Sequence, residues 1–361
     1  MVKTAIVQIG CGTIGSALIS QLSEIGQNSS LNHIGVFRSR TAIMNLEGLP
    51  INVVSDFSLS NMNSNSSLVT THDGSTEKIL QLIRAFEGRP ILVDLTASAQ
   101  TGDLYAEVLK KGGGVVSANK IPVSSSIDYW HDWIGYGGYL NSSMRIETTV
   151  GAGLPVLKTI AGLLETGDQI TSIKGCFSGT LGFLFDGLCQ SQKFSDVLNK
   201  ARSKGMTEPD PREDLSGMDV ARKIIILGRM VGLNCGLEDV EVENLIPDAY
   251  GQMRLQDFES NCHELNPIFE TLVEQAESRG KILCYLGSVS SGSLKVRIEE
   301  VDKYSVFGSL SGPENICVIH SERYREPLVI RGPGAGPAVT AAGVLQDILD
   351  LNRFLNGSAR G

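Results

Sequence analysis

Apolar runs alternate with amphipathic stretches along the first third of the chain. Four short apolar runs have the length and composition of buried strands, at residues 4–9, 33–38, 90–96 and 114–118. Helical periodicity lies between them, from Gly15 to about residue 26, over 75–87 and over 102–111. This alternation predicts an α/β fold with a doubly wound parallel sheet, and the Asn- and Ser-rich stretch 60–67 is expected to be a surface loop.

The pattern changes after residue 155 to longer amphipathic helices, expected at 155–166, 180–191, 194–204 and 214–231. Strand-like segments return at 282–289, 293–301, 315–320 and 327–330. A closing helix of about twenty residues begins in the glycine-rich segment 332–341. We therefore expect two domains: a first domain of residues 1–150 with 332–361, and an inserted α+β domain of residues 151–331.

Composition narrows the class of protein. The 361 residues are 42% hydrophobic and 20% charged, with 40 glycines and a net charge of −9. These values are typical of a soluble globular protein with many turns, and so acidic a chain is not expected to bind nucleic acid. No apolar run has membrane-spanning length and the chain enters a strand pattern at once, so neither a membrane segment nor a targeting peptide is expected.

The seven cysteines are scattered along the chain without a C-x-x-C pair, and only five histidines are present. Cys262 and His263 are adjacent rather than spaced as metal ligands. This pattern fits reduced thiols in an intracellular compartment, so a cytoplasmic location and no zinc site are expected.

The motif Gly10-x-Gly12-x-x-Gly15 follows the first predicted strand and opens the first predicted helix. In this context it predicts a dinucleotide site of the Rossmann type, because glycine lets the backbone approach a pyrophosphate and the helix N-terminus supplies amide donors. Glycines that merely turn a corner would not need this spacing. The predicted contact residues are Gly10, Cys11, Gly12, Thr13, Ile14 and Gly15.

The end of the second predicted strand bears on the choice of cofactor. NAD sites usually carry Asp or Glu there, whereas this chain has Phe37-Arg38-Ser39-Arg40. Two guanidinium groups suit the 2′-phosphate of NADP, so we expect NADP to be preferred over NAD, with Arg38 and Arg40 as its contacts. The alternative is that both arginines are solvated loop residues.

Polar residues also follow the next two predicted strands. Thr96, Ala97 and Ser98 come after one strand, and Ser117-Ala-Asn-Lys120 comes after the other. Ligands of such sheets bind at the carboxyl ends of the strands, so these residues are candidates to line the ribose and nicotinamide. Lys120 can lie beside a reacting carbonyl, with a solvated surface lysine as the alternative.

Residues 207–223 concentrate acidic side chains before a helix that carries Lys223. The acids are Glu208, Asp210, Glu213, Asp214 and Asp219. Two prolines break any preceding helix, Asp214 or Ser216 can cap the next one, and Asp219 and Lys223 share a helical face. Such a block can bind a small zwitterion, and an exposed Asp–Lys pair on a solvated helix is the alternative.

The segment Ser178-Gly179-Thr180 just precedes another predicted helix. Its amides and hydroxyls can bind a substrate carboxylate, because a helix N-terminus favours negative charge. Plain N-capping by Ser178 is the alternative.

Together these motifs resemble homoserine dehydrogenase over nearly the whole chain. The resemblance rests on residues 10–15, 93–98, 118–120, 147–155, 177–181, 208–223, 334–336 and 339–341. It implies NAD(P)H-dependent interconversion of L-aspartate 4-semialdehyde and L-homoserine, in the pathway to threonine, isoleucine and methionine. The glycine motif is common to many dehydrogenases, whereas the central and acidic motifs are specific.

The resemblance also implies roles for individual residues. Positions matching Glu208 and Asp219 bind the amino end of the substrate, and the lysine matching Lys223 is the proton donor and acceptor. Lys120 is implied to contact both substrate and cofactor. Further candidates are Asp214, Gly179 and Thr180 for the substrate, and Gly336 for the cofactor.

In similar proteins a monovalent cation, Na⁺, is bound by the segment that matches residues 147–154. Its implied ligands are the Glu147 carboxylate and the main-chain carbonyls of Val150, Ala152 and Leu154, since oxygen donors suit sodium. Glu147 can equally cap the turn. The resemblance further implies a homodimer built on strands near 144–150 and on the late strand segments.

Two features depart from the family pattern. Members usually carry an aromatic residue where this chain has Met206, which changes one contact of the substrate pocket. The chain ends soon after the closing helix, so we expect no control by threonine through a C-terminal regulatory domain. Two rival functions stay open. One is another NAD(P)-dependent amino-acid semialdehyde or amino dicarboxylate dehydrogenase, and the other is a non-catalytic NADP-binding sensor. Two aligned lysines argue against the sensor, because a binding protein does not need them.

Overall fold

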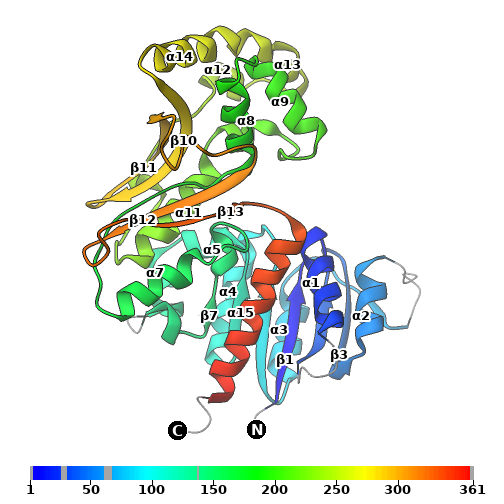
Figure 1. The fold of residues 1–361 in the computed structure, drawn as a ribbon. Helices are drawn as coiled ribbons and strands as arrows, with labels where there is room; N and C mark the ends of the chain where they lie inside the picture. The colour runs from blue at the N-terminus through cyan, green and yellow to red at the C-terminus, as the bar shows by residue number, and fades with distance from the viewer. Residues whose placement is uncertain (1–2, 26–30, 61–66, 136–137, 358–361) are drawn as a thin grey trace. The chain divides into compact units, whose positions relative to one another are not determined.

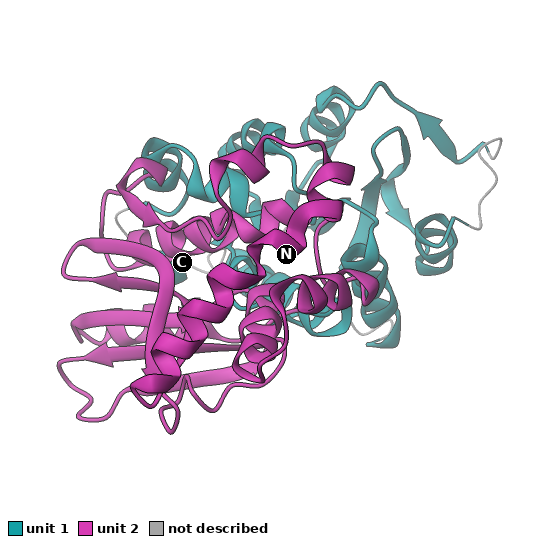
Figure 2. Ribbon diagram, turned by 90° about the horizontal axis from the view of Figure 1, so that it is seen from above, with its two compact units in different colours: residues 1–153, 336–361 teal, residues 154–335 magenta. Residues whose placement is uncertain are grey.

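A computed structural model describes residues 3–25, 31–60, 67–135 and 138–357. The chain divides into two compact units, unit 1 of residues 1–153 with 336–361 and unit 2 of residues 154–335 (Figure 2). The divisions fall after residues 153 and 335, where the sequence predicted 150 and 331. Most of the predicted loop 60–67 lies outside the described residues.

The described part of unit 1 contains a seven-stranded sheet in the order β4-β3-β2-β1-β5-β6-β7 (Figure 1). Five neighbouring strands are parallel: β2 (Asn32–Phe37), β1 (Thr4–Ile9), β5 (Arg89–Asp94), β6 (Gly114–Ser117) and β7 (Met144–Arg145). The first four match the predicted apolar runs, because strands covered on both faces are apolar throughout. The doubly wound sheet is therefore confirmed.

Two antiparallel strands extend this sheet, and the sequence did not predict them. They are β3 (Thr41–Leu49) and β4 (Val69–Thr71). The chain reverses directly after β2, where the amide of Arg38 donates to the carbonyl of Thr41 at 2.8 Å. A two-residue turn leaves no room for a crossover helix, so β3 has to run antiparallel to β2.

Helices pack on the sheet of unit 1, and the C-terminal helix is one of them. In Figure 1 α15 (Pro337–Gly357) lies beside α1 (Thr13–Glu24), and both contribute to one buried apolar cluster with β1, β5 and β6. The remaining helical segments are α2 (Ile51–Ser58), α3 (Glu77–Ala85), η2 (Ala99–Thr101), α4 (Gly102–Lys110), α5 (Lys120–Ser124), α6 (Ile127–Trp133), η3 (Tyr139–Asn141) and η4 (Glu147–Thr149). The last segment of the chain thus completes the core of the first domain.

Unit 2 is built on a six-stranded sheet in the order β13-β12-β8-β10-β11-β9 within the described residues. The strands are β8 (Ile170–Cys176), β9 (Val240–Val242), β10 (Lys281–Ser290), β11 (Ser293–Asp302), β12 (Glu314–Ser321) and β13 (Leu328–Pro333). Neighbours pair antiparallel except β11 and β9. The four late strands match predicted segments, and β8 and β9 were missed.

The helices of unit 2 include α11 (Met218–Met230), which packs against β10 and β11. A Cβ on Gly287 of β10 would come within 2.6 Å of the Ile224 side chain, so this glycine lets α11 lie directly on the strand. The other helical segments are α7 (Val156–Glu165), α8 (Gly179–Cys189), α9 (Phe194–Ser203), α10 (Pro211–Leu215), η5 (Leu237–Asp239), α12 (Asp248–Gly251), α13 (Leu255–Asn261), η6 (Cys262–Leu265) and α14 (Asn266–Ser278). No helix in the described ranges is both long and apolar enough to cross a membrane.

The helix predicted over 214–231 is in fact two helices, α10 and α11, separated by Gly217. This glycine has φ +74°, a left-handed conformation that ends one helix and starts the next at a new angle. Asp210 caps α10, whereas the predicted cap residue Asp214 lies inside α10. The other predicted cap, Ser216, accepts a hydrogen bond from the amide of Met218 at 3.3 Å.

We predict that Gly217→Ala destabilises unit 2 more than Gly232→Ala does. Both glycines have positive φ, which costs an alanine about 1–2 kcal/mol. At Gly217 the new methyl group would also lie 2.1 Å from the Tyr285 hydroxyl, whereas at Gly232 nothing lies within 4 Å. Thermal unfolding of the two variants, and of Gly217→Ala combined with Tyr285→Phe, measures the difference; equal losses for the two single variants would contradict it.

Candidate active site

The glycine motif of unit 1 forms a tight turn from β1 into α1. Gly10 has φ +96°, and a Cβ on Gly15 would lie 2.3 Å from the carbonyl oxygen of Gly10. A Cβ on Gly12 would meet nothing within 4 Å, and Gly12 is the exposed N-cap of α1. Two glycines therefore serve packing, while the third leaves open space in front of the helix N-terminus, as a bound pyrophosphate requires.

The residues between these glycines differ in their surroundings. Thr13 is exposed and Ile14 is half-buried in the first turn of α1. Cys11 is half-buried, its Sγ lies 3.9 Å from the carbonyl oxygen of Phe37, and burial raises the pKa of its thiol to about 11. The thiol of Cys11 is therefore protonated at neutral pH.

The two arginines after β2 have different environments. The guanidinium of Arg38 donates from Nη2 to the carbonyls of Phe57 and Ser58, the second at 2.7 Å, and lies 4.6 Å from the centre of the Phe57 ring. Arg40 is exposed in the β2–β3 turn, and its carbonyl accepts from the amide of His72 at 3.0 Å. Arg38 thus caps the end of α2, while the Arg40 side chain is presented to solvent.

A buried carboxylate, Asp94, organises the carboxyl ends of β5 and β6. It is 0% exposed and accepts hydrogen bonds from the Tyr105 hydroxyl at 2.7 Å, from Asn119 Nδ2 at 3.1 Å, and from the amide and hydroxyl of Thr96 at 2.9 and 2.8 Å. Burial, and then the charge of Asp94, raise the pKa of Tyr105 well above its usual value. The phenol therefore remains a donor at any pH the protein meets.

This network determines the positions of the candidates at the strand ends. Thr96 accepts from the amide of Ser98 at 3.2 Å, and the hydroxyl of Ser117 bonds to that of Tyr105 at 2.8 Å. Ala97 is exposed between Thr96 and Ser98. Asn119 caps the short helix α5, whose first residue is Lys120. The predicted hydroxyl residues are hence partly structural, and Lys120 is a cationic side chain at this edge of the sheet.

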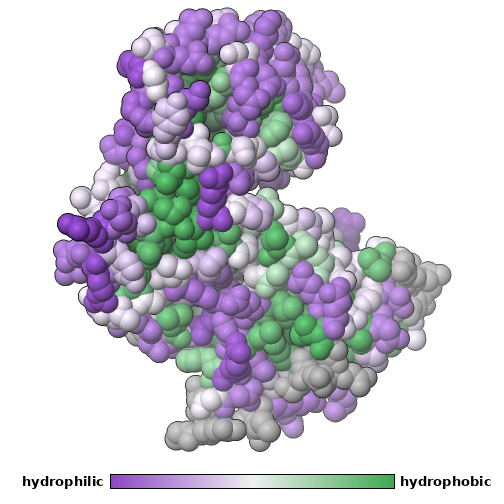
Figure 3. Space-filling view, in the orientation of Figure 1, coloured by the Kyte–Doolittle hydropathy of each residue, from purple (hydrophilic) through white to green (hydrophobic). Residues whose placement is uncertain are grey.

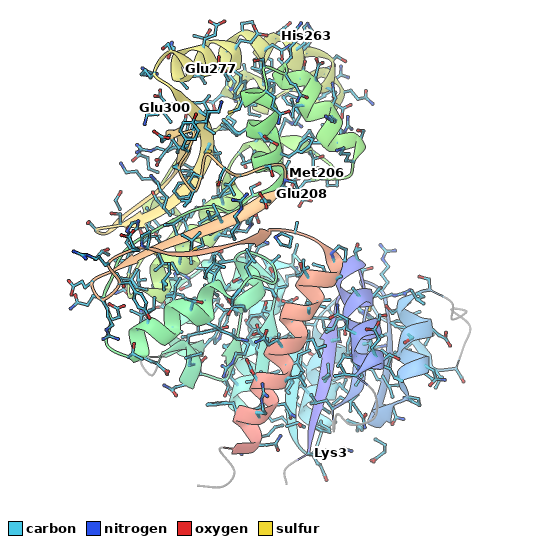
Figure 4. All side chains as sticks on the ribbon, viewed as in Figure 1. Lys3, Met206, Glu208, His263, Glu277 and Glu300 are labelled. Atoms are coloured by element: carbon cyan, nitrogen blue, oxygen red, sulfur yellow. The ribbon has the colours of Figure 1, made fainter. Side chains whose placement is uncertain are left out.

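The acidic segment 207–223 of unit 2 is held together by internal hydrogen bonds and lies next to the start of α8. Met206 and Glu208 lie on the loop that follows α9 (Figure 4). The amide of Glu208 donates to Oδ2 of Asp214 at 2.8 Å, and the hydroxyl of Thr180 donates to the carbonyl of Met206 at 2.7 Å. Burial raises the pKa of Asp214 above its usual range, and the charges of Glu208 and Asp219 contribute to the rise. Three acids therefore lie close enough to repel one another, which favours a bound cation.

Lys223 lies beside these acids. Its Nζ is 2.7 Å from Oδ2 of Asp219 and donates to the carbonyl of Phe177 at 2.6 Å. The Lys223 side chain is only 12% exposed, whereas that of Asp219 is 47% exposed. The predicted i,i+4 pair is real, but it is not the solvated surface pair that the sequence allowed, because the lysine is largely buried.

The N-terminus of α8 lies in the same unit. The Ser178 hydroxyl accepts from the amide of Leu181 at 3.2 Å, so the N-capping alternative is correct for this serine. A Cβ on Gly179 would lie 3.3 Å from the carbonyl oxygen of Pro313. Thr180 is linked to Met206 as described, so the helix start and the acidic segment are joined by a hydrogen bond.

The proposed cation segment follows β7. Glu147 is 3% exposed, and its amide donates to Oδ2 of Asp347 in α15 at 3.1 Å. Gly151 and Ala152 have φ of +80° and +53°, so the chain after Val150 turns sharply. No group of three or more His, Cys, Asp or Glu side chains that suits a metal occurs among the described residues, so an ion here would depend on main-chain oxygens.

Some functional groups escaped the sequence analysis. Asp94 at the last position of a buried strand is a detectable signal, since an acid there needs several donors. Asn119 was read only as part of the segment before Lys120. Its Nδ2 donates to Asp94, to the hydroxyls of Thr96 and Thr101 and to the carbonyl of Ser98, and this set of contacts has no sequence signature. The carbonyl of Phe177 is invisible in any sequence because every residue carries one.

Two family models match the chain: homoserine dehydrogenase over residues 155–349, and the NAD-binding domain of homoserine dehydrogenase over residues 10–132. The homoserine dehydrogenase of Paracoccidioides brasiliensis (strain Pb18) is 37% identical over 358 residues, covering 95% of this chain and 96% of the relative.

Solved structures share the fold. A Candida auris protein of unknown function superposes with a TM-score of 0.85 at 30% identity, covering 98% of both chains. A hyperthermophilic archaeal homoserine dehydrogenase in complex with NADPH superposes with a TM-score of 0.74 at 22% identity, covering 96% of this chain and 97% of the other. With matches of this extent, the chain belongs to the homoserine dehydrogenase family of oxidoreductases.

Proposed function

We propose that the protein interconverts L-aspartate 4-semialdehyde and L-homoserine with NADP(H) in the cytoplasm, on the route to threonine, isoleucine and methionine. The observation that carries this proposal is the buried Lys223 ammonium at 2.7 Å from Asp219, next to two further acids. A protonated amine beside carboxylates suits a small amino acid whose side chain ends in a carbonyl. Family membership supports the same reaction.

The proposed chemistry divides between the cofactor and the residues of the chain. The nicotinamide, when bound, supplies or removes the hydride. Lys223 donates a proton to the oxygen of the aldehyde as it becomes an alkoxide, and takes the proton back in the oxidation of homoserine. An ammonium has three N–H groups, and the described residues engage two, through Asp219 and Phe177, which leaves one for the substrate oxygen.

The remaining acids are assigned to binding the substrate. Glu208 and Asp219 attract the α-ammonium, and Asp214 holds the Glu208 loop through its hydrogen bond to the amide. The amides of Gly179 and Thr180 at the start of α8 suit the α-carboxylate, because a helix N-terminus carries positive potential. Lys120 in unit 1 is proposed to contact substrate and cofactor and to assist the proton transfer.

The residues of unit 1 suit a dinucleotide. Space in front of Gly12, the N-terminus of α1 and the strand-end residues Thr96 and Ser98 support the assignment, and Gly336, with φ +135°, is a further proposed contact. We propose NADP as the preferred form, which the NADPH complex of the archaeal relative supports. Arg40 is the better placed contact for the 2′-phosphate, since Arg38 is held by α2.

Paired arginine variants test this cofactor assignment. We expect Arg40→Gln to raise KM for NADPH about 10-fold or more and to leave KM for NADH nearly unchanged, because a charge-assisted phosphate contact is lost. Arg38→Gln should instead lower the melting temperature, since the α2 carbonyls lose their donor. Steady-state kinetics with both cofactors measure the first effect, and the same rise in both KM values for Arg40→Gln would refute it.

We further propose that Na⁺ is bound by the Glu147 carboxylate and the carbonyls of Val150, Ala152 and Leu154. The near-complete burial of Glu147 and the sharp turn at Gly151 and Ala152 support the site. Oxygen ligands of this kind suit a hard monovalent cation, whose charge would offset the buried acid. The ion would act in structure rather than in chemistry.

The cation site predicts a specific dependence of stability on salt. Wild-type protein should melt a few degrees higher in NaCl than in choline chloride at equal ionic strength, because an ion that binds only the folded state stabilises it. Glu147→Gln should abolish the difference, whereas the exposed control Glu87→Gln should retain it. Differential scanning fluorimetry suffices, and a sodium effect that survives in Glu147→Gln would exclude this site.

We propose a homodimer built on the strands near 144–150 and on the late strands of unit 2. Figure 3 shows hydrophobic residues gathered over the strands of its sheet, and Tyr304, Tyr324 and Val329 are 93%, 45% and 44% exposed. Among the described strands β13 is at the end of the sheet, so a second copy can cover its outer edge. Sedimentation equilibrium would report twice the chain mass of 38.7 kDa if the proposal is correct.

Lys223→Ala tests the central assignment. We expect kcat for homoserine oxidation to fall about 10²–10⁴-fold, the usual contribution of a general acid or base, while NADP⁺ binding is retained. Lys200→Ala, which removes an exposed lysine from the same unit, should leave kcat nearly unchanged. If Lys223→Ala retained wild-type turnover, the proposed proton donor would be wrong; absence of homoserine turnover in wild-type protein would refute the reaction itself.

A further inference from the structure

Asn315 on β12 is a buried side chain whose amide has no partner. The residue is 1% exposed, and neither Oδ1 nor Nδ2 forms a hydrogen bond with the described residues. Leaving a buried polar group unsatisfied costs about 1–3 kcal/mol per group. Both polar atoms of this amide are therefore available to a bound molecule.

The sheet register places Asn315 next to the proposed substrate site of unit 2. Ile316 pairs with Cys176 of β8, so Asn315 is beside the step from Cys176 to Phe177, the residue whose carbonyl binds Lys223. Two residues earlier, Pro313 lies against Gly179 at the start of α8. The amide therefore lies along the same strand ends as the Lys223 contact and the helix N-terminus.

Glycine at position 334 lets the Asn315 amide pack directly against the main chain. A Cβ on Gly334 would lie 1.9 Å from Cγ of Asn315, 2.0 Å from Oδ1 and 2.4 Å from Nδ2. Any other residue at 334 would displace the amide or cover both of its polar atoms. The absence of a side chain at 334 and the unpaired amide at 315 are therefore two parts of one arrangement.

A carboxamide offers one donor group and one acceptor, and an α-amino acid zwitterion offers the complementary pair. We propose that Asn315 binds the main-chain end of the amino-acid substrate, with Nδ2 donating to the α-carboxylate and Oδ1 accepting from the α-ammonium. This inference rests on the proposed function, and it adds a neutral contact to the charged contacts of Glu208, Asp219 and the α8 N-terminus. A neutral amide orients both charges without changing the net charge of the site.

Asn315→Leu and Asn315→Asp test the inference. Leucine keeps the shape and removes both hydrogen bonds, so we expect KM for homoserine to rise about 10-fold or more, with KM for NADP⁺ within about twofold of wild type. The melting temperature of Asn315→Leu should equal or exceed that of wild type, because an unsatisfied amide is replaced by an apolar group. A purely structural asparagine would give the opposite pair of results.

Asn315→Asp serves where the leucine variant does not fold. It retains the shape and the acceptor but faces the substrate carboxylate with a negative charge, so KM for homoserine should again rise by at least about 10-fold while kcat changes less. Asn199→Asp, an exposed asparagine on α9, is the matched control and should be unchanged. Homoserine KM within twofold of wild type in either folded Asn315 variant would overturn the inference, whereas inactive wild-type protein would overturn the proposed function instead.

Discussion

The buried charge of Asp94 is the constraint on which the ligand-facing edge of unit 1 depends. A carboxylate without solvent is tolerated only while it is fully hydrogen-bonded, and here the donors come from α4 and from the segments that follow β5 and β6. Each donor is therefore held in place, because breaking its hydrogen bond would leave the buried carboxylate of Asp94 less well satisfied. The residues proposed to face the cofactor, from Thr96 to Ser98 and at Lys120, are positioned by this buried network.

In unit 2 the main electrostatic feature is repulsion among three neighbouring acids. Glu208, Asp214 and Asp219 raise one another's free energy in the absence of a cation, and Lys223 relieves only part of that repulsion. The three acids therefore favour a second cationic group, and under the proposed function the α-ammonium of the substrate is that group. Under the proposed function, substrate binding and proton transfer share a residue, because Asp219 contacts Lys223 at 2.7 Å and is also assigned to the α-ammonium of the substrate.

The sequence predicted those elements whose burial or turn geometry shows in a short local pattern of residues. Strands β1, β2, β5 and β6 were predicted because they are buried on both faces. The Gly10–Gly15 turn was predicted because its glycine spacing is typical of a tight turn from a strand into a helix. β3 was missed because its exposed half breaks the apolar pattern, and the α10–α11 break because Gly217 reads as an ordinary helix glycine. Asn315 lies beside Phe177 because of the register between β12 and β8, and the sequence alone does not give that register.

The attachment of Arg38 to α2 has a consequence for how this protein can change over evolutionary time. One of two neighbouring arginines is tied into the framework, and the other stands on a two-residue turn with its side chain in solvent. Substitutions of the Arg40 side chain are therefore expected to change the folding free energy little, while those of Arg38 remove its contacts with α2. Under the proposed assignment, stability depends on position 38 and cofactor choice on position 40, so a lineage can exchange one nicotinamide cofactor for the other without first acquiring compensating mutations in the core.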